Sequence, residues 1–466
     1  MNVYSKILKN EKLYIILFWI IYTLLCVHFY VERSTFADNS YYLFNIIQQQ
    51  KFCIQYDRYF AVFTQWLPLL AVKLKLSLNA ILYAHSLSPI ILNISLFLLI
   101  RYLSTEKWIS YVYLLAISTA LHDAFFYVND EMAQASSLLL LIPTILRTKK
   151  WNETYKTIAL MLLILLLHLA HLFLLLTALI ILCIMLLEKR QRSMILGIVI
   201  VVIPILIKAV FFKSGRDGDS IDALSWHAIT IKNLYASVFA KFFIYSVPNF
   251  YVFTIGFMLV LLLRVSIKKI SLLALFSASI GLYILMVVFI RSDVTTNAYM
   301  DRYLSIIIMI GWTVVAFVIS KNNIENPLYK LALMLTIGMA FAQLYAEPAY
   351  TKRIEFLSTL MKHKPNKQIY LYEEMPDVIK KITWSIPYET LLISSLEGES
   401  KTILFQENHF NLDNYLADET YFLGAPWTFK HPTLLNPFYF SLKNARYVFK
   451  HPTLLNPFYF SLKNAR

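Results

Sequence analysis

Glycine, cysteine and charged residues are all scarce in this chain of 466 residues. It has nine glycines and three cysteines, and only 15% of its residues are charged, whereas 58% are apolar. No ordinary water-soluble domain combines these values. The composition therefore predicts a membrane protein and excludes soluble enzyme folds.

The motifs of several common mechanisms are also missing. Cys26, Cys53 and Cys183 are far apart, and the chain has no CxxC pair or His/Cys cluster at zinc spacing, so no disulfide framework or structural metal site is indicated. There is no Walker loop, dinucleotide-binding glycine motif, GxSxG or HExxH. Nucleotide-driven pumping and the common hydrolase mechanisms therefore have no support.

The net charge of +15 would suggest a nucleic-acid partner in a soluble protein. Here, however, the excess Lys and Arg lie mostly in short connections between apolar blocks. Basic residues are typical of the cytoplasmic connections of membrane proteins. We interpret the charge as a sign of membrane topology and predict no binding of nucleic acid.

The apolar residues form blocks that can each cross, or nearly cross, a hydrocarbon layer of about 30 Å. The longest, Thr157 to Leu187, would reach about 46 Å as one helix, and basic residues flank both of its ends. We therefore predict a hairpin that turns near His168 and His171, and about 11 transmembrane helices in total. The other predicted spans are 13–31, 79–101, 107–121, 132–146, 193–212, 249–264, 269–290, 302–320 and 328–345.

The basic connections place the N-terminus in the cytoplasm and the C-terminus outside. The outside turn His122 to Glu131 agrees, since it has three acids and no base. We divide the chain into a transmembrane domain (1–345), an external soluble domain (346–446) and a duplicated tail (447–466), in which residues 449–466 repeat 429–446 without a change. In a bacterium these would be an inner-membrane protein and a periplasmic C-terminal domain.

Two long outside segments, 32–78 and 213–248, contain apolar residues at helical spacing, which predicts interfacial helices in the first and fourth outside loops. A partly buried loop helix is the alternative in each case. Strand-like runs at 368–372, 390–394 and 402–406 around a helix at 376–383 predict a small α+β external domain. The fold class is thus an all-α polytopic membrane protein with that small domain attached. The two stripes are Tyr59, Phe63, Trp66, Leu67, Leu70 and Leu74, and then Ile231, Leu234, Tyr235, Val238, Phe239 and Phe242.

Acidic residues follow two of the predicted spans on the outer face. Asp38 comes shortly after the first span, and Asp130 and Glu131 lie at the start of the span at 132–146. A partly desolvated carboxylate can act as a general base, and the three together could hold a divalent cation such as Mg²⁺ or Mn²⁺. Helix capping and complementing of the helix dipole are the structural alternatives.

Two further groups of polar residues are expected on this face. His168 and His171 are three positions apart, which would put them on one helix face, where they could bind a metal or a phosphate or simply mark the turn of the hairpin. Arg291 and Arg302 lie in an outside loop and could grip a phosphate, or could pair with neighbouring aspartates.

This pattern resembles the GT-C superfamily of integral membrane glycosyltransferases over roughly residues 10 to 345. The resemblance rests on Asp38-Asn39-Ser40-Tyr41-Tyr42 after the first span, on the surface-helix segment Phe60 to Leu70, and on Asp130-Glu131 in the second outside loop. The chain departs from protein mannosyltransferases at Asn39, where they have an acid, and it has no WWDYG motif.

The resemblance implies an inverting transfer of a sugar from a polyprenyl-phosphate-linked donor to a lipid or glycan acceptor. Asp38 would take the proton from the acceptor hydroxyl. Asp130 and Glu131, with His168 and His171, would position the acceptor or a cation, and Arg291 or Arg302 would stabilise the departing phosphate.

Other classes of membrane protein are alternatives. An O-antigen polymerase or ligase also uses lipid-linked sugars outside, but it fits the acidic first loop and the external tail less well. A secondary transporter or glycolipid flippase would show broken spans and charges at mid-membrane, whereas Lys208 is nearly the only charge inside a predicted span. A non-enzymatic scaffold would tolerate alanine at Asp38.

Overall fold

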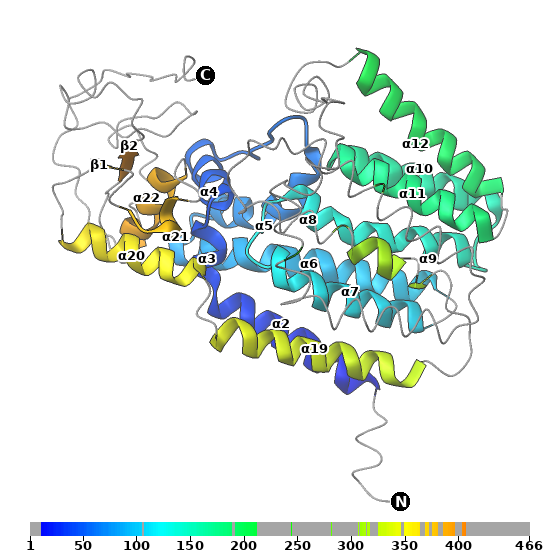
Figure 1. The fold of residues 1–466 in the computed structure, drawn as a ribbon, viewed down its shortest axis with the longest axis horizontal. Helices are drawn as coiled ribbons and strands as arrows, with labels where there is room; N and C mark the ends of the chain where they lie inside the picture. The colour runs from blue at the N-terminus through cyan, green and yellow to red at the C-terminus, as the bar shows by residue number, and fades with distance from the viewer. Residues whose placement is uncertain are drawn as a thin grey trace, which may run out of the picture.

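The structure is a computed structural model, and most of the residues it describes lie in helices (Figure 1). The longer described segments are 11–104, 107–188, 192–211, 325–345, 349–363 and 385–396. The shorter ones are 308–313, 315–316, 369–371, 375–380 and 403–406, with single residues at 244, 281 and 306.

The long helices coincide with most of the apolar blocks within this part of the chain. Among the described residues, α2 and α6 are long and apolar enough to cross a membrane, judged by length and composition. Shorter apolar stretches of 10–17 residues are Trp108–Thr119, Leu172–Leu186, Ser193–Leu206 and Leu328–Phe341. The long helices are α2 (Glu11–His28), α6 (Leu78–Leu103), α7 (Trp108–Ala124), α10 (Glu153–His168), α11 (Leu172–Glu188), α12 (Arg192–Phe211) and α19 (Glu325–Tyr345).

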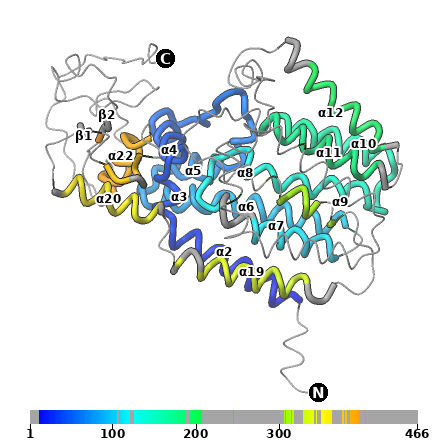
Figure 2. Tube along the Cα trace, in the orientation of Figure 1, coloured from blue at the N-terminus to red at the C-terminus, as the bar shows by residue number. Residues whose placement is uncertain are grey.

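The predicted division of the long block 157–187 into two helices is confirmed. Helix α10 ends at His168, helix α11 begins at Leu172, and the two pack against each other and against α12 (Figure 2). The backbone N–H of Leu169 bonds to Leu165 O at 2.9 Å, closing the last turn of α10 before the chain reverses.

The block at 132–146 is not the single helix that its apolarity predicts. It consists of α8 (Glu131–Ala135), the 3₁₀-helix η2 (Ser136–Leu140) and α9 (Leu141–Arg147). The serine hydroxyls of Ser136 and Ser137 donate to the carbonyls three residues back, at 2.6 and 2.9 Å. Pro143 has no N–H to donate to Leu139, and its ring would clash with that carbonyl in a regular α-helix. The tighter 3₁₀ turns avoid this conflict.

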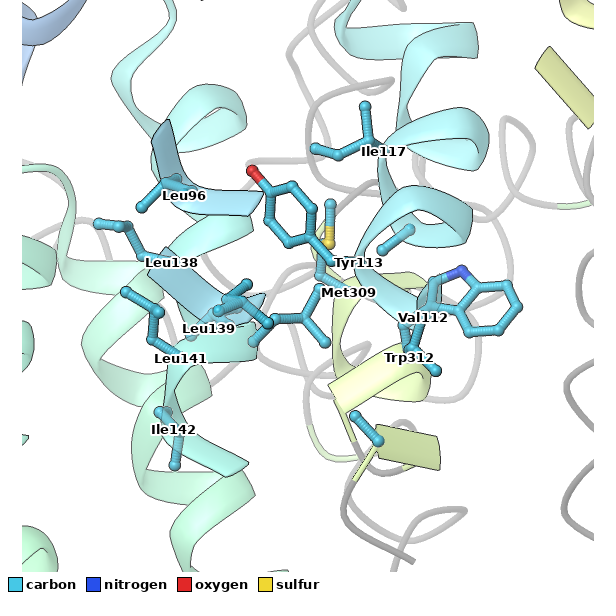
Figure 3. Packing of buried hydrophobic residues seen from close by; sticks show 14 of the residues in the cluster. Leu96, Val112, Tyr113, Ile117, Leu138, Leu139, Leu141, Ile142, Met309 and Trp312 are labelled. Carbon is cyan, nitrogen blue, oxygen red and sulfur yellow. The ribbon is translucent and has the colours of Figure 1, made fainter. Parts of the chain in front are cut away.

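The core of the bundle is formed where α7, α19 and the η2–α9 segment meet buried residues near 308–316. Figure 3 shows Tyr113 and Trp312 among leucine, isoleucine and methionine side chains. Their polar atoms are satisfied, since Tyr113 donates to Asn93 Oδ1 at 2.9 Å and Trp312 donates to Thr119 Oγ1 at 3.0 Å. Helix α19 also packs along α2 (Figure 1).

The connections predicted for the cytoplasmic side meet at one end of the helices. Arg101 at the end of α6 pairs with Glu11 at the start of α2, and Lys107 lies 3.8 Å from the same carboxylate. The hydroxyl of Thr148, after α9, donates to Leu103 O at 2.7 Å. These contacts require α2 to run antiparallel to α6, as the predicted topology does.

The connections predicted for the outer side meet at the opposite end. Phe60 N–H in the first loop donates to Leu169 O in the hairpin turn at 3.1 Å. Asn129 N–H in the second outside turn donates to Asn39 Oδ1 at 3.1 Å. The first three predicted outside segments are therefore neighbours in space, although they are spread over residues 32–171 of the sequence.

The first outside loop folds into α3 (Tyr30–Thr35), α4 (Asp38–Gln49), the 3₁₀-helix η1 (Tyr59–Ala61) and α5 (Val62–Lys73). The helix predicted from the first apolar stripe is thus present. Its polarity is inverted relative to a soluble helix, because Thr64 and Gln65 are buried while the apolar stripe is exposed. The exposed stripe consists of Tyr59, Phe63, Trp66, Leu70 and Leu74.

The C-terminal segment adds α20 (Ala349–His363), α21 (Asp377–Lys380), α22 (Ile386–Leu396) and two short strands. The strands β1 (Ile369–Leu371) and β2 (Leu404–Gln406) pair in parallel, as two of the strand-like runs predicted. The third run, 390–394, is wrong as a strand, since it lies inside α22. All five residues of the run are buried, so the sequence lacks the alternation of apolar and polar residues that distinguishes a half-buried strand from a buried helix.

Several predictions lie outside the described residues. These are the spans 249–264 and 269–290, most of 302–320, the interfacial helix at 231–242, and the tail 447–466. The count of eleven spans and the domain boundaries at 345 and 446 therefore stay predictions. Helix α22 does pack directly against α4 of the first loop.

Candidate functional site

Two acidic segments, predicted from separate outside loops, are joined by the side chain of Asn39. Its Nδ2 donates to Phe126 O at 2.6 Å and to Arg33 O at 2.8 Å, while its Oδ1 accepts from Asn129 N. Asn39 is buried and makes contacts with both sides of the junction. It therefore fixes the start of α4 against the turn that carries Asp130 and Glu131.

Tyr42 extends this junction to the second acidic segment. It lies four residues after Asp38, and so on the same face of α4. Its buried hydroxyl donates to Glu131 Oε1 at 3.1 Å. The face of α4 that carries Asp38 is thus directed toward Glu131.

Glu131 is an almost completely buried carboxyl group, with 4% of its surface exposed. Burial raises the pKa of Glu131 to about 7, because the charged form loses its hydration. The positive charge of Arg58 and the Tyr42 hydrogen bond lower this pKa, and the charge of Asp130 raises it, but burial is the largest effect. Glu131 can therefore gain or lose a proton near neutral pH.

Asp38 is the first residue of α4 and is only partly buried. The capping position before it is taken by Ala37, whose backbone has φ 46° and ψ −123°. L-residues rarely adopt a positive φ, and such a conformation costs about 1–3 kcal/mol unless its surroundings impose it. The turn is closed by the Ser40 hydroxyl, which donates to Ala37 O at 2.7 Å.

Asp130 has the structural role that was the alternative for each acid. It is the N-cap of α8, and its Oδ1 accepts from the backbone N–H of Ala133 at 2.8 Å. This bond satisfies one of the free N–H groups at the start of the helix. Asp130 is also buried, so it contributes negative charge beside Glu131 more than it offers a reactive group.

Arg58 is a site residue that the sequence analysis missed. It lies before η1, and its charge acts on both Glu131 and Tyr42. Its guanidinium lies over the ring of Tyr56 at 5.6 Å. The available signal was its position, since it is the one arginine between residues 34 and 78.

A second missed group is the buried set around His85 of α6. The hydroxyl of Ser34 donates to Leu82 O at 3.1 Å and lies 3.1 Å from His85 Nδ1, so its oxygen must accept a hydrogen bond from Nδ1–H. His85 Nε2 is then the acceptor for the amide of Asn129 at 2.6 Å. This single tautomer connects α3, α6 and the second outside turn beneath the acidic residues.

The two histidines of the hairpin do not lie on one helix face. His168 ends α10, whereas His171 lies beyond it in the turn, because the chain reverses at Leu169 and Ala170. The Nδ1 of His171 accepts from Phe173 N–H at 3.1 Å and so caps α11. This is the turn-marking role, one of the alternatives for the pair.

The described residues do not form a ligand set for a cation. No group of three or more His, Cys, Asp and Glu side chains in this part of the chain could hold a metal ion. Asp130 caps α8, and Glu131 is engaged by Tyr42. Arg291 and Arg302, predicted to bind phosphate, lie outside the described residues.

Comparisons with known proteins found no match to a protein family, a curated protein or a solved structure. The function therefore has to be argued from the arrangement of the site itself.

Proposed function

We propose that this chain is a membrane glycosyltransferase of GT-C type. In this proposal it transfers a sugar, with inversion, from a polyprenyl-phosphate-linked donor to a lipid or glycan acceptor. The reaction takes place at the outer face of the membrane, which is the periplasmic face of the inner membrane in a bacterium. The N-terminus is cytoplasmic and the C-terminal segment is on the side of the reaction.

The observation that carries the proposal is the joining of the two acidic segments at one end of the helices. Asn39 and Tyr42 of α4 bond to Asn129 and Glu131, which are about 90 residues away in sequence. The two acidic loops meet beside Arg58, so a carboxylate that can act as a base and a positively charged guanidinium lie within one site. A scaffold would need neither of these chemical groups.

The surface beside the site supports a lipid-linked substrate. The exposed side of α5 consists of aromatic and aliphatic residues, while its polar residues are buried. An apolar face of this kind is stable when lipid covers it. Large apolar side chains are also exposed along α2, α6, α10 and α12. The polyprenyl chain of the donor would lie along this apolar surface.

The reaction assigns one role to each group. Asp38, the more accessible carboxylate, takes the proton from the acceptor hydroxyl while the hydroxyl oxygen attacks the anomeric carbon. The bond between that carbon and the phosphate oxygen breaks, and the polyprenyl phosphate leaves with the electron pair. Arg58 stabilises the developing negative charge of the phosphate. Glu131 holds Tyr42, and through it the face of α4.

The test is transfer of radiolabelled sugar from polyprenyl-linked donors to lipid acceptors in membranes that contain wild type or Asp38→Asn at matched expression. We expect transfer by wild type and its loss in Asp38→Asn. Parallel reactions with EDTA, and with Mg²⁺ or Mn²⁺ restored, test whether a divalent cation is required. Equal transfer by both proteins would remove Asp38 from the mechanism and favour a transporter or scaffold.

A further inference from the structure

A buried ion pair in the C-terminal segment lies next to the first-loop acid. Arg353 of α20 and Glu389 of α22 are joined by two bonds, Nε to Oε2 at 2.7 Å and Nη2 to Oε1 at 3.0 Å. Only 2% and 1% of their side chains are exposed. Arg353 Nη1 also donates to Ile379 O at 3.3 Å. The pair thus fixes α20, α21 and α22 to one another.

Glu389 also reaches out of this segment to the turn before α4. Its Oε1 accepts from the backbone N–H of Ala37 at 3.1 Å, a contact across 352 positions of sequence. The same oxygen accepts from the Ser385 hydroxyl at 2.5 Å. The guanidinium of Arg353 lies 6.0 Å from the ring centre of Phe36. The pair therefore contacts the two residues that precede Asp38, Arg353 at Phe36 and Glu389 at Ala37.

The position of Asp38 in the site depends on the residue directly before it, Ala37. Its positive φ is a conformation that an L-residue leaves unless neighbouring groups hold it. A charged acceptor in a buried setting forms a strong bond to the peptide N–H. The direction in which Asp38 leaves the turn is set by this peptide. A relaxed Ala37 would turn the first residue of α4 away from its present position.

We propose that Glu389 is a positioning residue for Asp38: it holds the Ala37 peptide in its strained conformation and thereby aims the carboxylate at the acceptor. The inference rests on the proposed function, because it gives Glu389 a purpose in the transfer reaction. It makes the C-terminal segment a part of the site, although Glu389 is buried and contacts no substrate.

The main variant must remove the bond to Ala37 without leaving an isolated buried charge. Glu389→Ala would strand Arg353 and could prevent folding. The double variant Arg353→Met, Glu389→Met removes both charges together and fills the space with side chains of similar length. Glu389→Gln is the conservative variant, since its amide oxygen can still accept from Ala37.

Thr390→Val is the matched control on the same helix. Thr390 is buried next to Glu389, and its hydroxyl oxygen accepts from Ile403 N–H at 3.0 Å, a bond that does not involve the first loop. Its loss loosens α22 from β2 without touching Ala37. A second change, Ala37→Gly in the double variant, tests rescue, because glycine adopts a positive φ without strain.

Two readouts are measured on the full chain in lipid nanodiscs: kcat and KM for transfer, and amide hydrogen exchange in residues 36–42. In the double variant we expect kcat to fall at least about tenfold, since small misplacements of reacting groups have effects of this order. KM for the donor should stay within about twofold, and exchange at 36–42 should rise. Glu389→Gln should keep most of kcat, and Ala37→Gly should restore much of it.

The outcomes separate the positioning role from a general effect on folding. Equal losses of kcat in the double variant and Thr390→Val, with no rescue by Ala37→Gly, would overturn the inference, as would unchanged exchange at 36–42. If wild type transfers no sugar, but exchange at 36–42 rises only in the double variant, then Glu389 still holds the turn and the proposed function is what fails.

Discussion

Two described helices, α4 and α8, start at the same end of the bundle with an aspartate at or next to their first residue, yet the two aspartates are used differently. At α8 the carboxylate of Asp130 occupies the capping position and accepts from Ala133 N–H. At α4 the capping position is Ala37, which has no side-chain oxygen, and Asp38 comes one residue later. The turn before α4 is instead bonded to Glu389, from the other end of the chain.

The difference shows how one sequence feature can serve two purposes. A helix that caps itself needs nothing from elsewhere, and its acid is committed to the backbone. At α4, by contrast, Glu389 bonds to the turn before the helix, so a distant residue takes part in holding the helix start. Asp38 is also the more exposed of the two acids. The comparison therefore assigns chemistry to Asp38 and structure to Asp130.

The largest expected effect separates the two aspartates in the transfer assay. Asp38→Asn should lower kcat by about 10²- to 10⁴-fold, the usual contribution of a general base. Asp130→Asn should keep kcat within about threefold, because asparagine caps helices about as well as aspartate. Both variants are compared in nanodiscs at equal protein concentration. Similar losses in the two would show that the acids act as one unit.

The next effect is a pH dependence of stability at Glu131. Its pKa is about 7 in the folded protein against a usual value of 4.5. Below pH 4.5 both states are protonated. Between pH 4.5 and 7 only the unfolded state releases its proton, so burial of Glu131 lowers the free energy of unfolding by about 3 kcal/mol, and this loss persists above pH 7.

The variant Glu131→Gln removes this dependence. It should be more stable than wild type at pH 8, and the two should converge near pH 4.5. Thermal unfolding in detergent between pH 4.5 and 8 measures the difference. A constant difference in Tm at every pH would contradict the expected titration of Glu131.

A smaller effect is expected where the two acidic segments touch. Tyr42→Phe removes the hydroxyl that donates to Glu131 Oε1. We expect the free energy of unfolding to fall by about 1.5–3 kcal/mol at pH 8, because the lost bond is then to a charged carboxylate. At pH 5, where Glu131 is protonated, the loss should be smaller. Combining Tyr42→Phe with Glu131→Gln gives a double-mutant cycle, and strict additivity at pH 8 would mean that the negative charge of Glu131 does not strengthen the bond.

The smallest effect tests the cap of α8 alone. Asp130→Ala should lower the free energy of unfolding by about 1 kcal/mol, the typical cost of losing an N-cap. Asp130→Asn is the control, because its amide oxygen can still accept from Ala133 N–H. Urea unfolding of both variants in mixed micelles provides the measurement. If Asp130→Asn loses as much as Asp130→Ala, charge rather than capping is what Asp130 supplies.

Much of the helical arrangement could be predicted from the sequence. Basic residues on both sides of the block 157–187 predicted the hairpin, and Leu169 lies in its turn. The stripe from Tyr59 to Leu74 predicted α5, since apolar residues at a period near 3.6 fit one helix face. The 3₁₀ segment at Ser136–Leu140 could not be predicted from apolarity, because it depends on Pro143 and two serine hydroxyls.

The candidate site was only half predicted. Asp38, Asp130 and Glu131 were recognised as acids at the ends of apolar blocks, but a sequence pattern does not distinguish a cap from an accessible carboxylate. Arg58 was missed because it lies among polar loop residues. Glu389 gave no signal, since its contact with Ala37 spans 352 positions.

The sequence by itself determined where the apolar helices among the described residues lie and at which end of the bundle the acidic residues collect. These follow from composition, periodicity and the distribution of charge, all of which are local properties. Only the tertiary structure decided which acid caps a helix, which one is buried beside Tyr42, and which segment holds the turn before α4. Burial and hydrogen-bond partners depend on residues that are distant in sequence, and folding alone brings them together.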